Sequence, residues 1–218
     1  YETKTFQFDV AADSDLYLDS FSNDYTIQWQ LTGPEGVVND WRSFRDANGP
    51  YNGSSVSPIL RAPAGTYTLT VRGNSTSATG TVGFRIVDVG ASAETLEFGQ
   101  LVHAVLDQDT QVRFYAFDAD RLDVLYQERL TGNTDYYDSI RIVGPNNQTV
   151  SGPTTYFGQL SKVTLPQTGR YYLVVEGRQG MPVGGTSVDF IVHQPQNVAK
   201  AITLQGPNGP TGFLEDEG

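Results

Sequence analysis

Aromatic side chains gather in a stretch of the sequence that is otherwise typical of a loop. Residues 40–53 read DWRSFRDANGPYNG, and no hydrophobic period of about 2 or about 3.6 residues organises them. An aromatic ring can cover the apolar face of a sugar or of a proline, while neighbouring amides and charges bind hydroxyl groups. The candidate ligand-binding residues, in this stretch and in a tyrosine pair later in the chain, are Trp41, Phe44, Arg45, Tyr51, Tyr136 and Tyr137.

Aspartates form a second candidate site, because several of them are spaced two to four residues apart. Carboxylate oxygens at such spacings on a loop can surround one Ca²⁺ ion, and calcium is the one cofactor expected. No EF-hand loop is present, and an acidic loop that is merely solvated has the same composition, so both interpretations stay open. The candidate metal ligands are Asp9, Asp13, Asp15, Asp107, Asp109, Asp118, Asp120 and Asp123.

Neither histidine of the chain, His103 or His193, belongs to a catalytic motif. A Gly-x-Ser-x-Gly elbow, a His-Glu-x-x-His pair and a phosphate-binding glycine loop are all missing from the sequence. A pair of carboxylates could hydrolyse a glycoside, but an acidic surface produces such pairs by accident. The chain is therefore predicted not to be an enzyme, with both histidines at the surface or at strand ends. A glycan-cleaving activity is the remaining alternative.

Composition excludes several classes of partner and chemistry. The 218 residues carry a net charge of -11 and no cysteine. Disulfides, cysteine nucleophiles and cysteine zinc sites are thus excluded, and the acidic charge argues against binding to nucleic acid. No run approaches the roughly 18 apolar residues that span a bilayer, so no membrane insertion is expected.

The sequence contains an internal repeat, and the elements that position these residues occur in both copies of it. Four segments recur in the same order at offsets of 104–111 residues, which is long enough for each copy to be a domain. Within them, Tyr67, Leu69 and Val71 alternate with polar residues, as expected of antiparallel strands. The paired segments are 6–21 with 115–130, 27–36 with 138–147, 59–73 with 163–177, and 81–88 with 187–194.

The predicted fold class is all-β, with two tandem antiparallel β-sandwich domains of jelly-roll or Greek-key type. We place the domains at residues 1–90 and 91–196. The tail 197–218 has the outline of the lead-in strand of a further repeat, which suggests a window from a longer tandem array. In each copy a turn precedes a tyrosine, Tyr67 or Tyr171, and this pattern predicts a tyrosine corner, in which the hydroxyl bonds to upstream backbone.

The aromatic stretch is predicted to be an insertion in a connection. The segment from the GP turn to the glycine before the corner tyrosine is 32 residues long in the first copy, from Gly33 to Gly65. The same segment is 25 residues long in the second copy, from Gly144 to Gly169. Connections are where rigid scaffolds carry binding residues, which favours a binding role. Alternatively, the rings close the open end of a core or pack against the second domain, and the sequence leaves this choice open.

The second copy resembles the bacterial pre-peptidase C-terminal (PPC) family. The resemblance rests on the lead-in at 93–110, on FYAFDA at 114–119, on the GP turn and on LPQTGRYYLVVEG at 165–177. It covers residues 93–194 well and residues 3–88 more loosely. It implies a small jelly-roll sandwich that is a non-catalytic appendage of secreted proteases and surface proteins. The collagen-binding modules of clostridial collagenases are relatives, and calcium sites occur in their lead-in.

Together these observations predict a non-catalytic module of a secreted or cell-surface bacterial protein. It would act as a spacer or adhesion module, stiffened by Ca²⁺, with the neighbouring domains of its parent chain as partners. The alternative is a targeting module that binds an extracellular polysaccharide or a collagen-like matrix peptide for an attached hydrolase.

Overall fold

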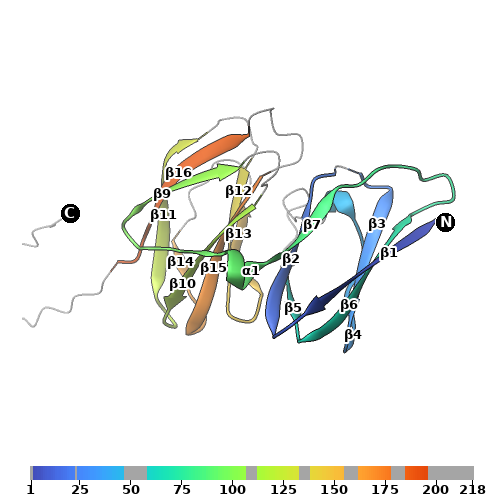
Figure 1. Ribbon diagram of the computed structural model, residues 1–218. Coiled ribbons are helices and arrows are strands. Elements are labelled where there is room, and N and C mark those ends of the chain that lie inside the picture. Colours follow the sequence, from blue (N-terminus) through green and yellow to red (C-terminus); the bar gives the residue numbers. More distant parts are fainter. Residues whose placement is uncertain are drawn as a thin grey trace, which may run out of the picture.

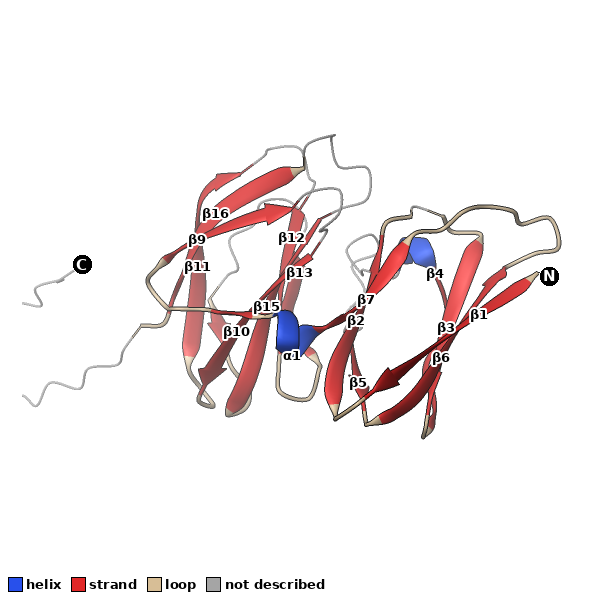
Figure 2. Ribbon diagram, viewed as in Figure 1, coloured by secondary structure: helices blue, strands red, loops and turns tan. Residues whose placement is uncertain are grey.

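The computed structural model describes residues 2–22, 24–46, 58–106, 112–132, 138–154, 162–177 and 185–195. These residues form four β-sheets, which pack in pairs as two sandwiches (Figures 1 and 2). The predicted fold class, all-β with two tandem sandwiches, is confirmed. The tail 197–218 lies outside the described residues.

The first sandwich is entirely antiparallel. One of its sheets, which we call the β1 sheet, has the strand order β1-β6-β3-β4, and the other, the β2 sheet, has the order β5-β2-β7. The strands are β1 (Thr3–Val10), β2 (Ser14–Ser20), β3 (Ile27–Gly33), β4 (Gly36–Ser43), β5 (Ile59–Ala62), β6 (Gly65–Gly73) and β7 (Phe84–Asp88), and a 3-10 turn η1 (Phe44–Asp46) follows β4.

The second sandwich repeats this order and adds one strand to each sheet. Its β10 sheet reads β13-β12-β15-β10-β8 and its β11 sheet reads β14-β11-β16-β9, where β8 pairs with β10 in parallel. A short helix, α1 (Val89–Ser92), links the sandwiches. The strands are β8 (Glu94–Thr95), β9 (Leu101–Leu106), β10 (Val112–Ala119), β11 (Val124–Gly132), β12 (Asp138–Val143), β13 (Thr149–Thr154), β14 (Val163–Thr164), β15 (Gly169–Gly177) and β16 (Thr186–His193).

Each sandwich has its own core, built from alternate residues of its strands. In the first, Tyr67, Leu69 and Val71 of β6 pack with Trp29 of β3. In the second, Tyr171, Leu173 and Val175 of β15 pack with side chains that include Phe117, Ile142 and Phe190. The period-2 pattern of the sequence therefore predicted the inward faces correctly.

Both predicted tyrosine corners are present. The Tyr67 hydroxyl donates to the carbonyl oxygen of Pro63 at 2.7 Å, and the Tyr171 hydroxyl donates to that of Gln167 at 2.5 Å. Each ring is fully buried, so each bond holds the turn before the strand against the core. The structural role predicted for these two tyrosines is confirmed.

The aromatic stretch is less irregular than its sequence indicates. Residues 40–43 belong to strand β4 and Phe44 begins the turn η1, so the expectation of a loop is wrong for residues 40–43. The register of β4 against β3 shifts twice, on either side of Leu31. Bulges of this kind break the two-residue period, which explains why the strand was not recognisable.

The four sheets lie one behind another (Figure 1). The β2 sheet of the first sandwich faces the β10 sheet of the second, with α1 beside the junction. The β1 sheet and the β11 sheet lie at the two ends of the stack. The junction therefore joins two different types of sheet, the β2 sheet of the first sandwich and the β10 sheet of the second.

Candidate functional site

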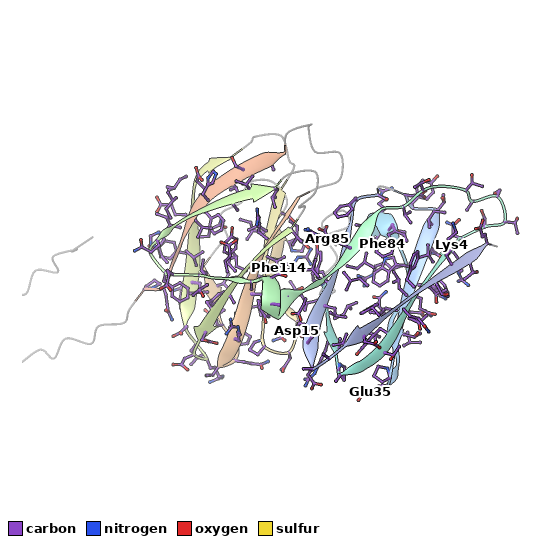
Figure 3. The ribbon with its side chains drawn as sticks, viewed as in Figure 1. Lys4, Asp15, Glu35, Phe84, Arg85 and Phe114 are labelled. Carbon is purple, nitrogen blue, oxygen red and sulfur yellow. The ribbon has the colours of Figure 1, made fainter. Side chains whose placement is uncertain are left out.

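An apolar cluster lies at the junction of the two sandwiches. Its members are buried, and the Tyr17 and Phe114 rings meet edge to face with centroids 5.3 Å apart. Figure 3 shows Phe114 at this junction, near Asp15 and Arg85 of the first sandwich. The first sandwich contributes Tyr17, Ile59 and Val89, and the second contributes Val112, Phe114, Ala116, Val143, Tyr172 and Val174.

A buried polar network crosses the centre of this cluster. The Tyr17 hydroxyl donates to Glu176 Oε1 at 2.8 Å. Arg141 donates from Nε and Nη2 to Glu176 Oε2, at 2.8 and 2.7 Å, and Ser139 adds a longer bond of 3.4 Å. Tyr17, Arg141 and Glu176 are all fully buried. Paired charges at this depth need such partners, because an isolated buried charge is strongly unfavourable.

Burial also shifts the pKa values of this network. Desolvation raises the pKa of Glu176 above its ordinary 4.5, although Arg141 and the Tyr17 hydroxyl oppose that rise. Desolvation, together with the neighbouring Glu176 charge, raises the pKa of Tyr17 well above its ordinary 10.0. Tyr17 therefore keeps its proton, and remains a hydrogen-bond donor, at pH values at which an exposed tyrosine begins to ionise.

Further polar pairs surround the cluster. Arg85 binds the buried Asp19 carboxylate from both Nε and Nη2, each at 2.8 Å. Asn147 of the second sandwich donates to Asp15 Oδ1 of the first at 2.6 Å. The junction therefore combines an apolar cluster, a buried network of paired charges and further polar pairs around them.

A polar cleft opens beside the junction, with a volume of about 520 Å³. Its carboxylates already serve the structure: Asp13 accepts a bond from the Ala64 amide, Asp15 accepts one from Asn147, and Asp88 caps helix α1. The residues that line it are Asp13, Ser14, Asp15, Arg61, Asp88, Gly90, Ala91, Pro145, Asn146, Asn147 and Tyr172.

The predicted calcium ligands do not assemble into a site within the described residues. There, no three or more His, Cys, Asp or Glu side chains lie close enough together to hold a metal ion. Asp9 binds the Thr66 hydroxyl and Asp123 binds the Gln194 amide, while Asp118 and Asp120 share no metal site with them. Asp107 and Asp109 lie outside the described residues.

The predicted ligand-binding aromatics separate into different environments. Phe44 is 0% exposed and packs on Phe84 at a ring distance of 5.4 Å, so the hypothesis that it meets a ligand is corrected: its ring fills the first core. Arg45 follows in η1, half-buried, and its backbone amide donates to Asp24. The remaining predicted residues Tyr51, Tyr136 and Tyr137 lie outside the described residues.

Trp41 keeps a place on the surface, at the outer face of the β1 sheet. It is partly exposed, and the Arg72 guanidinium lies 3.6 Å from the centroid of its ring. Beside it, Asp40 accepts bonds from the Trp41 amide at 2.8 Å and from Gln30 at 3.0 Å, and these bonds hold the pKa of Asp40 below its ordinary value. The outward residues of this face are mostly threonines and glutamines.

Sequence reasoning missed the junction, although a signal was present. Positions that face outward in β1 and β6 are Thr5 and Thr70, and the same positions in β10 and β15 are Phe114 and Val174. Strands that are apolar on both faces are typical of sheets covered on both sides. The apolar outward residues of the second copy therefore indicate a sheet that is covered on both faces. The first copy has threonines at these positions and gives no such indication.

The comparisons with known proteins add little to this geometry. The sequence matches no protein-family model and no curated protein. Among solved structures, the CUB1-EGF-CUB2 domain of human MASP-1/3 has a TM-score of 0.27 and 11% identity, over 89% of this chain and 93% of that one. A candidate secreted protein from Eubacterium rectale has a TM-score of 0.26 and 9% identity, over 88% and 69%. TM-scores this low do not indicate a shared fold.

Within the described residues, no helix has the length and apolar character needed to cross a membrane.

Proposed function

We propose that this chain is a non-catalytic spacer module of a secreted or cell-surface bacterial protein, built from two PPC-like sandwiches held at a fixed separation. The observation that carries the proposal is the buried network of Tyr17, Glu176 and Arg141 inside an apolar junction. Domains of one chain move relative to each other by default, unless the interface between them is large and hydrophobic. Here the interface is an apolar cluster in which the buried charges of Arg141 and Glu176 are paired.

The spacer function predicts one sharp distance between the ends of the stack. The chain has no cysteine, so Glu35→Cys and Ser187→Cys place spin labels at exposed positions of the two sandwiches. We expect a single narrow distance distribution by pulsed electron spin resonance. Tyr17→Ala should broaden it, because this change removes both the ring contact with Phe114 and the bond to Glu176.

The matched control is Tyr126→Ala, which removes the same atoms from the equivalent but exposed position of the second sandwich. It should leave the distribution unchanged. A broad distribution in the protein without either alanine substitution contradicts a rigid spacer.

A second candidate function is binding of an extracellular glycan at the outer face of the β1 sheet. Trp41 supports it, since this ring is partly exposed among the amides and hydroxyls of Gln30 and Thr70. Such a surface combines an aromatic platform with neutral hydrogen-bonding groups.

This candidate predicts that Trp41→Ala weakens retention on an insoluble polysaccharide by about tenfold or more, equal to about 1.4 kcal/mol or more. Affinity electrophoresis against several polysaccharides, with a collagen-like peptide column in parallel, measures the effect. Tyr25→Ala is the control, because Tyr25 is 64% exposed elsewhere on the same sandwich. Equal losses in both variants, or no retention of the unaltered chain, contradict the glycan function.

A further inference from the structure

The outer face of the β11 sheet is unusually apolar for an exposed surface. Nine large apolar side chains are exposed among the described residues, and five of them lie on this sheet or on the turn before β11. Tyr126 is 41% exposed and Leu122 is 60% exposed, the latter in a positive-φ conformation that is strained for leucine. We call this surface the outer docking face; its apolar members are Leu101, Val105, Leu122, Tyr126 and Leu130.

The outer docking face shares two positions with the surface by which the first sandwich contacts the second. Strand β11 corresponds to β2, so Tyr126 stands where Tyr17 stands and Glu128 stands where Asp19 stands. Tyr17 and Asp19 are 0% exposed, and Tyr17 packs against side chains of the second sandwich. Their counterparts project from the same kind of sheet with nothing over them in the described residues.

Polar pairs border the outer docking face, as they border the junction. Glu128 pairs with His193 at 3.1 Å, and the His193 ring stacks on Tyr126 with centroids 4.5 Å apart. A second pair joins His103 to Asp189 on neighbouring strands. At the junction, Asp19, which stands where Glu128 stands, pairs with Arg85.

We propose that the outer docking face binds a further β-sandwich of this kind, in the same orientation in which the first sandwich binds the second. The inference rests on the proposed spacer function and names the partner that extends it. The occupant must present an apolar β10-type face with a glutamate for the Tyr126 hydroxyl. Contiguous exposed apolar side chains mark an interaction site, and at the junction the corresponding tyrosine, Tyr17, packs against a β10-type face.

A second copy of this chain does not meet that requirement. Its own β10 face is already covered by its first sandwich. Its exposed β1 face carries Thr5 and Thr70 where Phe114 and Val174 stand, and Arg72 where Glu176 stands. The chain on its own should therefore remain monomeric.

The requirement for a β10-type face can be tested by placing such a face on the first sandwich. The graft changes six outward positions of the β1 sheet to the residues at the corresponding positions of the β10 sheet. Because unlike faces then meet, the grafted chain should assemble head to tail into open filaments, while the unaltered chain stays monomeric in analytical ultracentrifugation. The substitutions are Thr5→Phe, Gln7→Ala, Gln28→Ser, Gln30→Arg, Thr70→Val and Arg72→Glu.

Two controls distinguish specific docking from nonspecific association. Adding Tyr126→Ala to the graft should return it to monomer, whereas adding Tyr25→Ala should not. Unaltered chain added in tenfold excess should shorten the filaments, because it offers the outer docking face but no grafted face and so caps one end. Circular dichroism of the monomeric variants checks that they are folded.

Several results would overturn the inference. They are a folded graft that stays monomeric, assembly that persists with Tyr126→Ala, and dimers of the unaltered chain that Tyr126→Ala abolishes. If the full graft does not fold, the smaller graft of Thr5→Phe, Thr70→Val and Arg72→Glu gives the same test at higher protein concentration. A monomeric graft with a narrow spin-label distance overturns this inference alone, whereas a broad distance in the unaltered protein overturns the spacer function.

Discussion

Arg141→Met lowers the free energy of unfolding by about 3–5 kcal/mol, because it leaves the Glu176 carboxylate buried without its counter-charge. Both tryptophans of the chain, Trp29 and Trp41, lie in the first sandwich. Urea unfolding followed by tryptophan fluorescence therefore reports on the first sandwich, while far-ultraviolet circular dichroism reports on both. We expect the circular dichroism transition to shift at least as far as the fluorescence transition.

Two further variants define the cause of that loss. Replacing both charges, with Arg141→Met and Glu176→Leu, should restore much of the stability, since a buried pair is costly mainly when only one partner is left. Arg170→Met, at an exposed position of β15, should change stability by less than about 0.5 kcal/mol. A loss below about 1 kcal/mol in Arg141→Met, well short of the cost of breaking a buried pair, contradicts the prediction.

The deficit of Arg141→Met should also depend on pH. The pKa of Glu176 is higher in the folded protein than its ordinary 4.5, and removing Arg141 raises it further. A raised carboxyl pKa contributes stability below the unfolded value and loses it as the pH rises through the folded value. The deficit is thus largest at neutral pH and shrinks as the pH falls toward 4.5.

Phe44→Ala is the second substitution with a large expected effect. Phe44 is 0% exposed in the first core, and truncation of a buried phenylalanine costs about 3–5 kcal/mol in unfolding free energy. Trp41→Ala removes a partly exposed ring and its contact with Arg72, which is worth about 1 kcal/mol or less. Urea unfolding of both variants by circular dichroism measures the difference. Equal losses would show that Trp41, and not only Phe44, belongs to the core.

The architecture was predictable from the sequence because its cause is local. Alternation at Tyr67, Leu69 and Val71, and again at Tyr171, Leu173 and Val175, follows from the two-residue period of a strand. The tyrosine corners have a turn signal beside each tyrosine. Repetition of these local rules at a fixed offset was enough to predict two sandwiches.

The candidate site was harder to predict because neighbours that are distant in the chain decide it. Asp13 and Asp15 are close in sequence, as a calcium site requires, but one bonds to Ala64 and the other to Asn147. Phe44 follows a strand whose bulges hide its period, so its burial could not be inferred from spacing. The mutual recognition of Tyr17 and Glu176 joins residues 159 positions apart.

In β6 and β15, the residues that face the core alternate with the residues that face away from it. The inward residues agree between the copies, with Tyr67, Leu69 and Val71 matching their counterparts, whereas all the outward residues differ. Substitution of the outward residues can therefore change what the strand binds, while the inward residues preserve the fold. Differences at every second residue of one strand accompany a face that is open to solvent in the first sandwich and covered in the second.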